Sequence, residues 1–128
     1  MKNEDKEYAL TVIKNVLKTM HNKKYMKILQ YVDESEEDEV GMSELFNYVQ
    51  ETLESNGFDA VDEYGIPCNF YPGHEYSQAE FFEFDDGSGF AVDYNLTSNS
   101  ELVDMSLQIE FLYIPGGLKS VFVTVDPQ

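Results

Sequence analysis

The alternation of apolar and polar residues near the end of the chain is the feature that most constrains the fold. Between residues 103 and 113, apolar side chains occupy every second position, at Val103, Met105, Leu107, Ile109, Phe111 and Tyr113. Successive side chains of a β-strand point to opposite faces, so this pattern predicts one long strand with a single buried face. The chain must therefore build a sheet that other elements cover on one side.

Other stretches of the C-terminal half are predicted to pair with this strand. Residues 82–84 and 90–97 alternate in the same way, and Asp86-Gly87 between them is a typical turn. Residues 115–117, Pro-Gly-Gly, lead into a last apolar strand over 121–125. Sequential strands joined by short turns predict an antiparallel meander.

Helical spacing of apolar residues is confined to the first half of the chain. It predicts three helices, over residues 4–20, 24–32 and 43–55. Ser43 is the predicted N-cap of the last helix, and Asn56-Gly57 its C-terminal stop. Because such helices bury their apolar stripes on the sheet, we expect one α+β domain: three N-terminal helices packed on a curved antiparallel sheet.

Charge divides the chain into two unequal parts. Residues 1–30 hold seven of the eight lysines and carry a net charge of +4, whereas residues 31–128 hold only Lys119 and 22 acids. The formal net charge is -17, and no arginine is present to clamp phosphate or carboxylate groups. Direct nucleic-acid binding is therefore disfavoured.

The sequence predicts a cytosolic protein. Its start, MKNEDKEYAL, has acidic residues where a signal peptide needs an apolar run, and no stretch approaches the roughly 18 apolar residues of a membrane span. A single cysteine, Cys68, cannot form an internal disulfide.

The predicted order of helices and sheet resembles the cone-shaped fold of the nuclear-transport-factor-like superfamily. The stretch from Val16-Leu17 through Asn22-Lys23-Lys24-Tyr25 to Ile28-Leu29 is similar to the first two helices of such domains. The resemblance implies a curved sheet with a pocket between sheet and helices. Enzymes of the superfamily often place an Asp or His in the cone, but no residue of this chain matches such a site.

A second resemblance is to a set of short uncharacterised bacterial proteins. Residues 90–97, Phe-Ala-Val-Asp-Tyr-Asn-Leu-Thr, followed by residues 104–107, Asp-Met-Ser-Leu, look like their aromatic-x-Val-Asp-aromatic-Asp-Leu run and Asp-Leu-x-Leu strand. This chain departs from that pattern, since Asn95 replaces an acid, no tryptophan follows Leu96 and the usual arginine is absent.

The acidic run of residues 33–39 has three interpretations. It is a solvated linker, because like charges repel each other, or a binding patch for a basic partner. The third is a calcium loop, in which loop positions 1, 3, 5, 7 and 12 would be Asp33, Ser35, Glu37, Glu39 and Glu44. That loop needs glycine at its sixth position, where the chain has Asp38.

Our leading hypothesis is a binding protein, acting as a stoichiometric inhibitor or immunity-type protein. Toxins and enzymes that bind nucleic acid are basic, so their inhibitors are often acidic. The acids and an aromatic loop over 64–76 would make the contact, through Asp33, Glu34, Glu36, Glu37, Asp38, Glu39, Glu51, Glu54, Asp59, Asp62, Glu63, Tyr64, Tyr71 and Tyr76.

The alternative is a small-molecule-binding or enzymatic cone domain, with a pocket lined by Phe90, Tyr94, Met105 and Phe111. Either Asp93 or Asp104 would be a general base if it pointed into the cone, and otherwise both are exposed strand acids. Cys68 and His74 are too few for a zinc site and lack a positioned base. We therefore expect no metal, cofactor or catalytic residue, and leave homo-oligomerisation through an exposed sheet face open.

Overall fold

The computed structural model describes residues 1–65 and 78–127. Its elements, in chain order, are α1 (Asn3–His21), the 3-10 helix η1 (Tyr25–Gln30), β1 (Glu34–Ser35), α2 (Glu39–Ser55), β2 (Ala79–Glu83), β3 (Gly89–Ser98), β4 (Glu101–Ile114) and β5 (Gly117–Pro127). The predicted α+β class is confirmed. The second predicted helix is a 3-10 helix, so the described residues contain two α-helices rather than three.

The five strands form one sheet in the order β1-β5-β4-β3-β2. Strands β2 to β5 make the predicted antiparallel meander, but β1 pairs with β5 in parallel, at Glu34 opposite Val121 and Ser35 opposite Phe122. The prediction of a purely antiparallel sheet was therefore wrong. The acids of the run are exposed, as in a solvated linker, but Glu34–Ser35 within it form an edge strand. The backbone N–H of Asp33 donates to the carbonyl of Ser120 at 3.0 Å, so edge pairing satisfies groups that the linker would leave to water.

Helix α2 begins four residues before its predicted start, because an acid of the same run caps it. The Asp38 carboxylate accepts a hydrogen bond from the Gly41 N–H at 2.7 Å. A carboxylate is favourable there both as an N-cap and as a charge at the positive end of the helix dipole. Ser43, the predicted cap, instead lies inside the helix.

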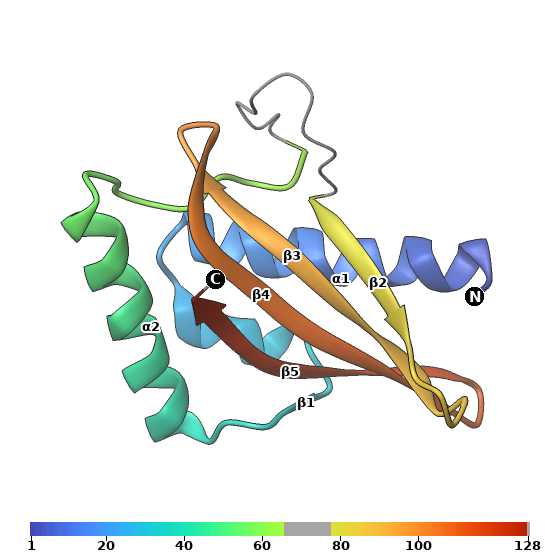
Figure 1. Ribbon diagram of the computed structural model, residues 1–128. Helices are drawn as coiled ribbons and strands as arrows, with labels where there is room; N and C mark the ends of the chain where they lie inside the picture. Colours follow the sequence, from blue (N-terminus) through green and yellow to red (C-terminus); the bar gives the residue numbers. More distant parts are fainter. Residues whose placement is uncertain (66–77, 128) are drawn as a thin grey trace.

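The hydrophobic core lies between the sheet and the helices. Figure 1 shows α1 crossing behind the strands and α2 standing beside their ends. Ile13, Val16 and Leu17 of α1 are fully buried in the same cluster as Phe90 and Phe111, whose rings stack at 5.2 Å. At the other end, Phe46 of α2 stacks on Tyr25 of η1 at 4.7 Å and packs against Phe122 of β5. The apolar stripe of each helix thus covers one face of one curved sheet.

The turn between β3 and β4 is held by an acid from the segment after α2. Asn99 and Ser100 have φ values of 50° and 66°, which suit a tight two-residue hairpin turn. The Asp62 carboxylate accepts hydrogen bonds from the N–H groups of Asn99 (3.1 Å) and Ser100 (2.8 Å) and from the Thr97 hydroxyl (3.0 Å). Asp62 therefore attaches the chain that leaves α2 to the far end of the sheet.

We predict that Asp62→Ala lowers the free energy of unfolding by about 2 kcal/mol, because three donors lose a charged acceptor. Urea denaturation measures the change. Glu63→Ala is the matched control, since Glu63 is the exposed neighbour that makes no hydrogen bond within the described residues. Equal stability of the two variants would show that Asp62 does not hold the hairpin.

Candidate functional site

The face of the sheet turned away from α1 is the candidate site, and we call it the open face. In Figure 1 no described helix lies in front of strands β2 to β5. Phe90, Val92 and Tyr94 of β3 are buried on the α1 side, so Ala91 and Asp93 between them lie on the open face. The Asp93 side chain thus points away from the core, as expected for an exposed strand acid.

A polar row crosses the open face from β2 to β5. The strand register places Glu80 opposite Asp93, Asp93 opposite Gln108, and Gln108 opposite Thr124. The Gln108 side-chain amide also donates to the Asp126 carboxylate at 3.1 Å. Three carboxylates, from three strands, therefore lie around one position of the sheet with no lysine among them.

Two carboxyl groups of this face have raised pKa values. Partial burial raises the pKa of Asp93, and the nearby carboxylates of Glu80 and Asp126 raise it further. Burial likewise raises the pKa of Glu110 on β4, and the charge of Glu36 adds to the shift. In both cases the charged form loses hydration and is repelled by other acids. A cation placed over these groups would reverse that penalty.

An exposed aromatic ring adjoins the acids. Phe82 of β2 lies opposite Ala91 in the row next to Glu80 and Asp93, and 47% of its surface is exposed. Lys119 lies farther along the face, where its ammonium group pairs with Glu34 at 3.2 Å. The open face therefore combines an apolar ring with several carboxylates that no lysine neutralises within the described strands.

The predicted partner-binding acids do not form one patch, because several have structural partners. Asp33 accepts hydrogen bonds from the N–H (2.9 Å) and hydroxyl (3.2 Å) of Ser120, and Glu34 pairs with Lys119. Asp38 and Asp62 bind backbone N–H groups as described above, and Asp59 forms an ion pair with Lys23.

The other predicted contact residues lie in separate places. Of the acidic run, Glu36 lies near Glu110 at the open face, while Glu37 and Glu39 are exposed at the start of α2. Glu51 and Glu54 are exposed on α2, and Glu63 follows in the next segment. The Tyr64 ring packs against Tyr94 at 5.8 Å. Tyr71, Tyr76, Cys68 and His74 lie outside the described residues.

Sequence reasoning missed three acids of the open face, Glu80, Glu110 and Asp126. For each of these acids, the period-two pattern predicts only that the side chain points away from the buried face. Their closeness to Asp93 and Glu36 depends on which strands pair and in which register, and no local pattern carries that information.

The four side chains predicted to line a pocket are part of the packed core. Phe90, Tyr94, Met105 and Phe111 are each at most 2% exposed and belong to one hydrophobic cluster. Across residues 1–65 and 78–127, no group of three or more His, Cys, Asp or Glu side chains is arranged to hold a metal ion. Within the same ranges, no helix combines the length and apolar character that crossing a membrane requires.

We predict that Asp93→Asn raises the free energy of unfolding at pH 7, by up to about 1 kcal/mol given solvent screening. The raised pKa means that the native protein holds the Asp93 proton more tightly than the unfolded chain does. That stabilisation is complete below the ordinary pKa of aspartate, about 3.9, and is lost as the pH rises through the native value.

Urea unfolding of Asp93→Asn and of the native chain at pH 7 and near pH 3 measures this effect. Asp93→Asn should have a higher free energy of unfolding than the native chain at pH 7, and the difference should be absent near pH 3. Glu51→Gln on the exposed surface of α2 is the control for removal of one negative charge. A loss of stability at pH 7 in Asp93→Asn would mean that the carboxylate has a favourable partner in the folded chain.

Comparison with known proteins identifies a family but no characterised relative. A family model described as a domain of unknown function, DUF7668, matches residues 17–127. No curated protein and no solved structure matches the chain significantly, so the resemblance to the nuclear-transport-factor-like superfamily stays a prediction. The matched region contains the C-terminal end of α1, all of η1 and α2, and the whole described sheet. The chain therefore belongs to the DUF7668 family.

Proposed function

We propose that this protein binds a basic protein partner through the open face and acts as a stoichiometric inhibitor or immunity-type protein. The partner would be a toxin or an enzyme that acts on nucleic acid. The observation that carries the proposal is a cluster of carboxylates that no lysine neutralises, in which the partly buried Asp93 lies beside the exposed Glu80 and Asp126. An exposed sheet face carrying acids and one aromatic ring is a surface suited to recognition, and function has to be argued from such a site and not from the fold.

The charge of these carboxylates favours a cationic partner for a physical reason. Asp93 and Glu110 already bear part of the cost of desolvation, because the fold partly buries them and surrounds them with like charge. A lysine or arginine from a partner would therefore meet acids that lose little further hydration on binding. The excess of acids over residues 31–128 would also speed the encounter with a basic surface.

Phe82 supplies the apolar contact that charge alone does not provide. Interfaces usually gain most of their affinity from a few buried aromatic or arginine anchors, and polar groups around them give specificity. Phe82 lies in the row beside Glu80 and Asp93, so one partner surface can cover the ring and both carboxylates together. This arrangement suits a partner that presents an apolar pocket rimmed by basic residues.

The small-molecule alternative has less support. Its four lining residues are buried in a continuous hydrophobic cluster, and two of them stack on each other at 5.2 Å. A ligand would have to displace side chains that already pack at the density of a protein core. The open face needs no such rearrangement.

We predict that Glu80→Lys/Asp93→Lys abolishes capture of the partner from a lysate of the source organism. The native chain should retain one basic protein at a near one-to-one ratio, and its retention should fall as salt is raised. Quantitative mass spectrometry of the bound fraction measures both properties. Phe82→Ala should weaken capture by more than about tenfold, as expected for an interface anchor.

The matched control is Glu51→Lys/Glu54→Lys, which makes the same change of charge on α2. This variant should still capture the partner, with at most a slower association. An equal loss of partner capture in the two charge-reversal variants would show that net charge alone causes capture. Full capture by Glu80→Lys/Asp93→Lys would place the interface elsewhere.

A further inference from the structure

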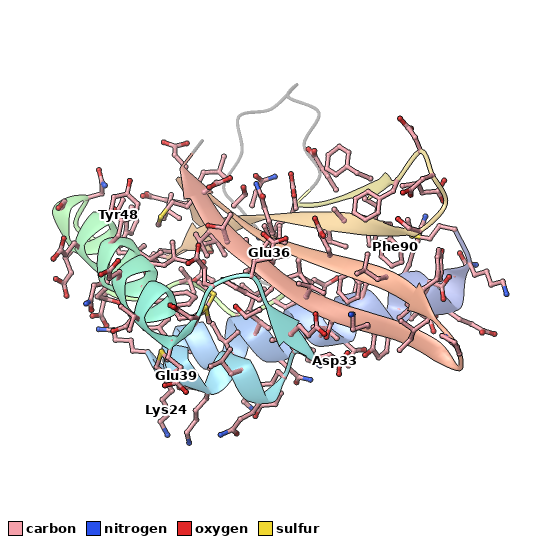
Figure 2. The ribbon with its side chains drawn as sticks, turned by 90° about the horizontal axis from the view of Figure 1, so that it is seen from below. Lys24, Asp33, Glu36, Glu39, Tyr48 and Phe90 are labelled. Carbon is pink, nitrogen blue, oxygen red and sulfur yellow. The ribbon has the colours of Figure 1, made fainter. Side chains whose placement is uncertain are left out.

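Three of the seven lysines of the first 30 residues line one depression on the helical side of the molecule. The depression has a volume of about 230 Å³ and lies between the last turns of α1 and the 3-10 helix η1. Its lining contains three lysines and four neutral polar residues but no acid, and consists of Asn15, Lys18, Thr19, Asn22, Lys24, Lys27 and Tyr31. Figure 2 shows Lys24 projecting from this side of the molecule.

The three lysines of the depression are unpaired although the chain is rich in acids. Among the described residues, Lys23 forms an ion pair with Asp59, and Lys119 forms one with Glu34. Lys18, Lys24 and Lys27 have no such partner within those residues. Three ammonium groups around one depression repel each other, and no acid of the described residues neutralises them there.

Two further donors face the same space without an internal partner. The side-chain amide of Asn15 and the hydroxyl of Tyr31 make no hydrogen bond within the described residues. The other polar side chains are occupied, since the Thr19 hydroxyl donates to the Asn15 carbonyl at 2.9 Å and the Asn22 amide to the Lys18 carbonyl at 2.9 Å. Thr19 and Asn22 thus hold the end of α1, while the lysines, Asn15 and Tyr31 remain for a ligand.

We infer that this depression binds a phosphoryl group carried by a small molecule. Lysine binds phosphate as a point charge. The amide of Asn15 and the hydroxyl of Tyr31 can donate further hydrogen bonds to the phosphate oxygens. The volume is below the roughly 300–1,000 Å³ of sites for drug-sized ligands, so it fits one mono- or diphosphate group. The rest of such a ligand would lie outside the depression.

A nucleic-acid backbone fits these observations less well. A strand of nucleic acid is bound along an extended basic groove, with aromatic side chains on which successive bases stack. Here the lysines surround one small depression with a single tyrosine, and residues 31–128 carry a strongly negative net charge. The inference does not rest on the proposed function, because it concerns the helical side and not the open face.

The test is a titration of the full chain with inorganic pyrophosphate at low salt, followed by amide NMR shifts. The site predicts saturable shifts that cluster at residues 15–31. Lys24→Gln/Lys27→Gln should weaken binding at least about tenfold, as expected for loss of charged hydrogen bonds. The matched control is Lys2→Gln/Lys6→Gln, which removes the same charge at the other end of α1 and should leave the affinity unchanged.

Three results would overturn the inference. The first is a titration without saturation, and the second is an equal loss of affinity in the two double variants, which would mean general attraction to positive charge. The third concerns the source of the phosphoryl group: a single-stranded oligonucleotide of about twelve nucleotides that bound the same lysines more tightly than pyrophosphate would rule out a small ligand.

Discussion

The scarcity of cations is the constraint on which the rest of this structure depends. With 25 acidic residues and eight lysines, the chain cannot neutralise its carboxylates by ion pairing. Carboxylates that stabilise the fold therefore bind N–H and hydroxyl groups instead, as Asp33 does at the edge of the sheet, Asp38 at the start of α2 and Asp62 at the β3–β4 turn. Each such bond draws part of its strength from the charge of the acceptor, without needing a lysine.

The same constraint separates the two sides of the molecule. On the open face, Asp93 and Glu110 are partly buried beside further acids, and the lysine of that face, Lys119, is already paired. On the helical side, Lys24 and Lys27 surround a depression without acids. The open face thus holds a local excess of carboxylates and the depression a local excess of lysines, and each would be stabilised by a partner of opposite charge. This separation is the physical basis of both proposals.

The sequence predicted those parts of the fold that local periodicity encodes. Period-two alternation over residues 103–113 predicted β4, and helical spacing over 4–20 predicted α1, each to within a few residues. Strand β1 could not be predicted, because Glu34 forms it by pairing with Val121 far away in the chain. The site was predicted less well: the acids of residues 33–63 were expected to act together, but tertiary contacts engage Asp33 and Asp62 separately, and Asp38 caps α2. The row from Glu80 to Asp93 required the register of β2 against β3.

If the open face is the binding surface, the bound partner covers it. Carbodiimide labelling of carboxyl groups, read by mass spectrometry with and without the captured partner, tests it residue by residue. We expect the partner to lower labelling of Glu80, Asp93, Glu110 and Asp126, while Glu51 and Glu54 on α2 stay equally reactive. Protection of Glu51 and Glu54 with unchanged labelling of Glu80 and Asp126 would contradict it.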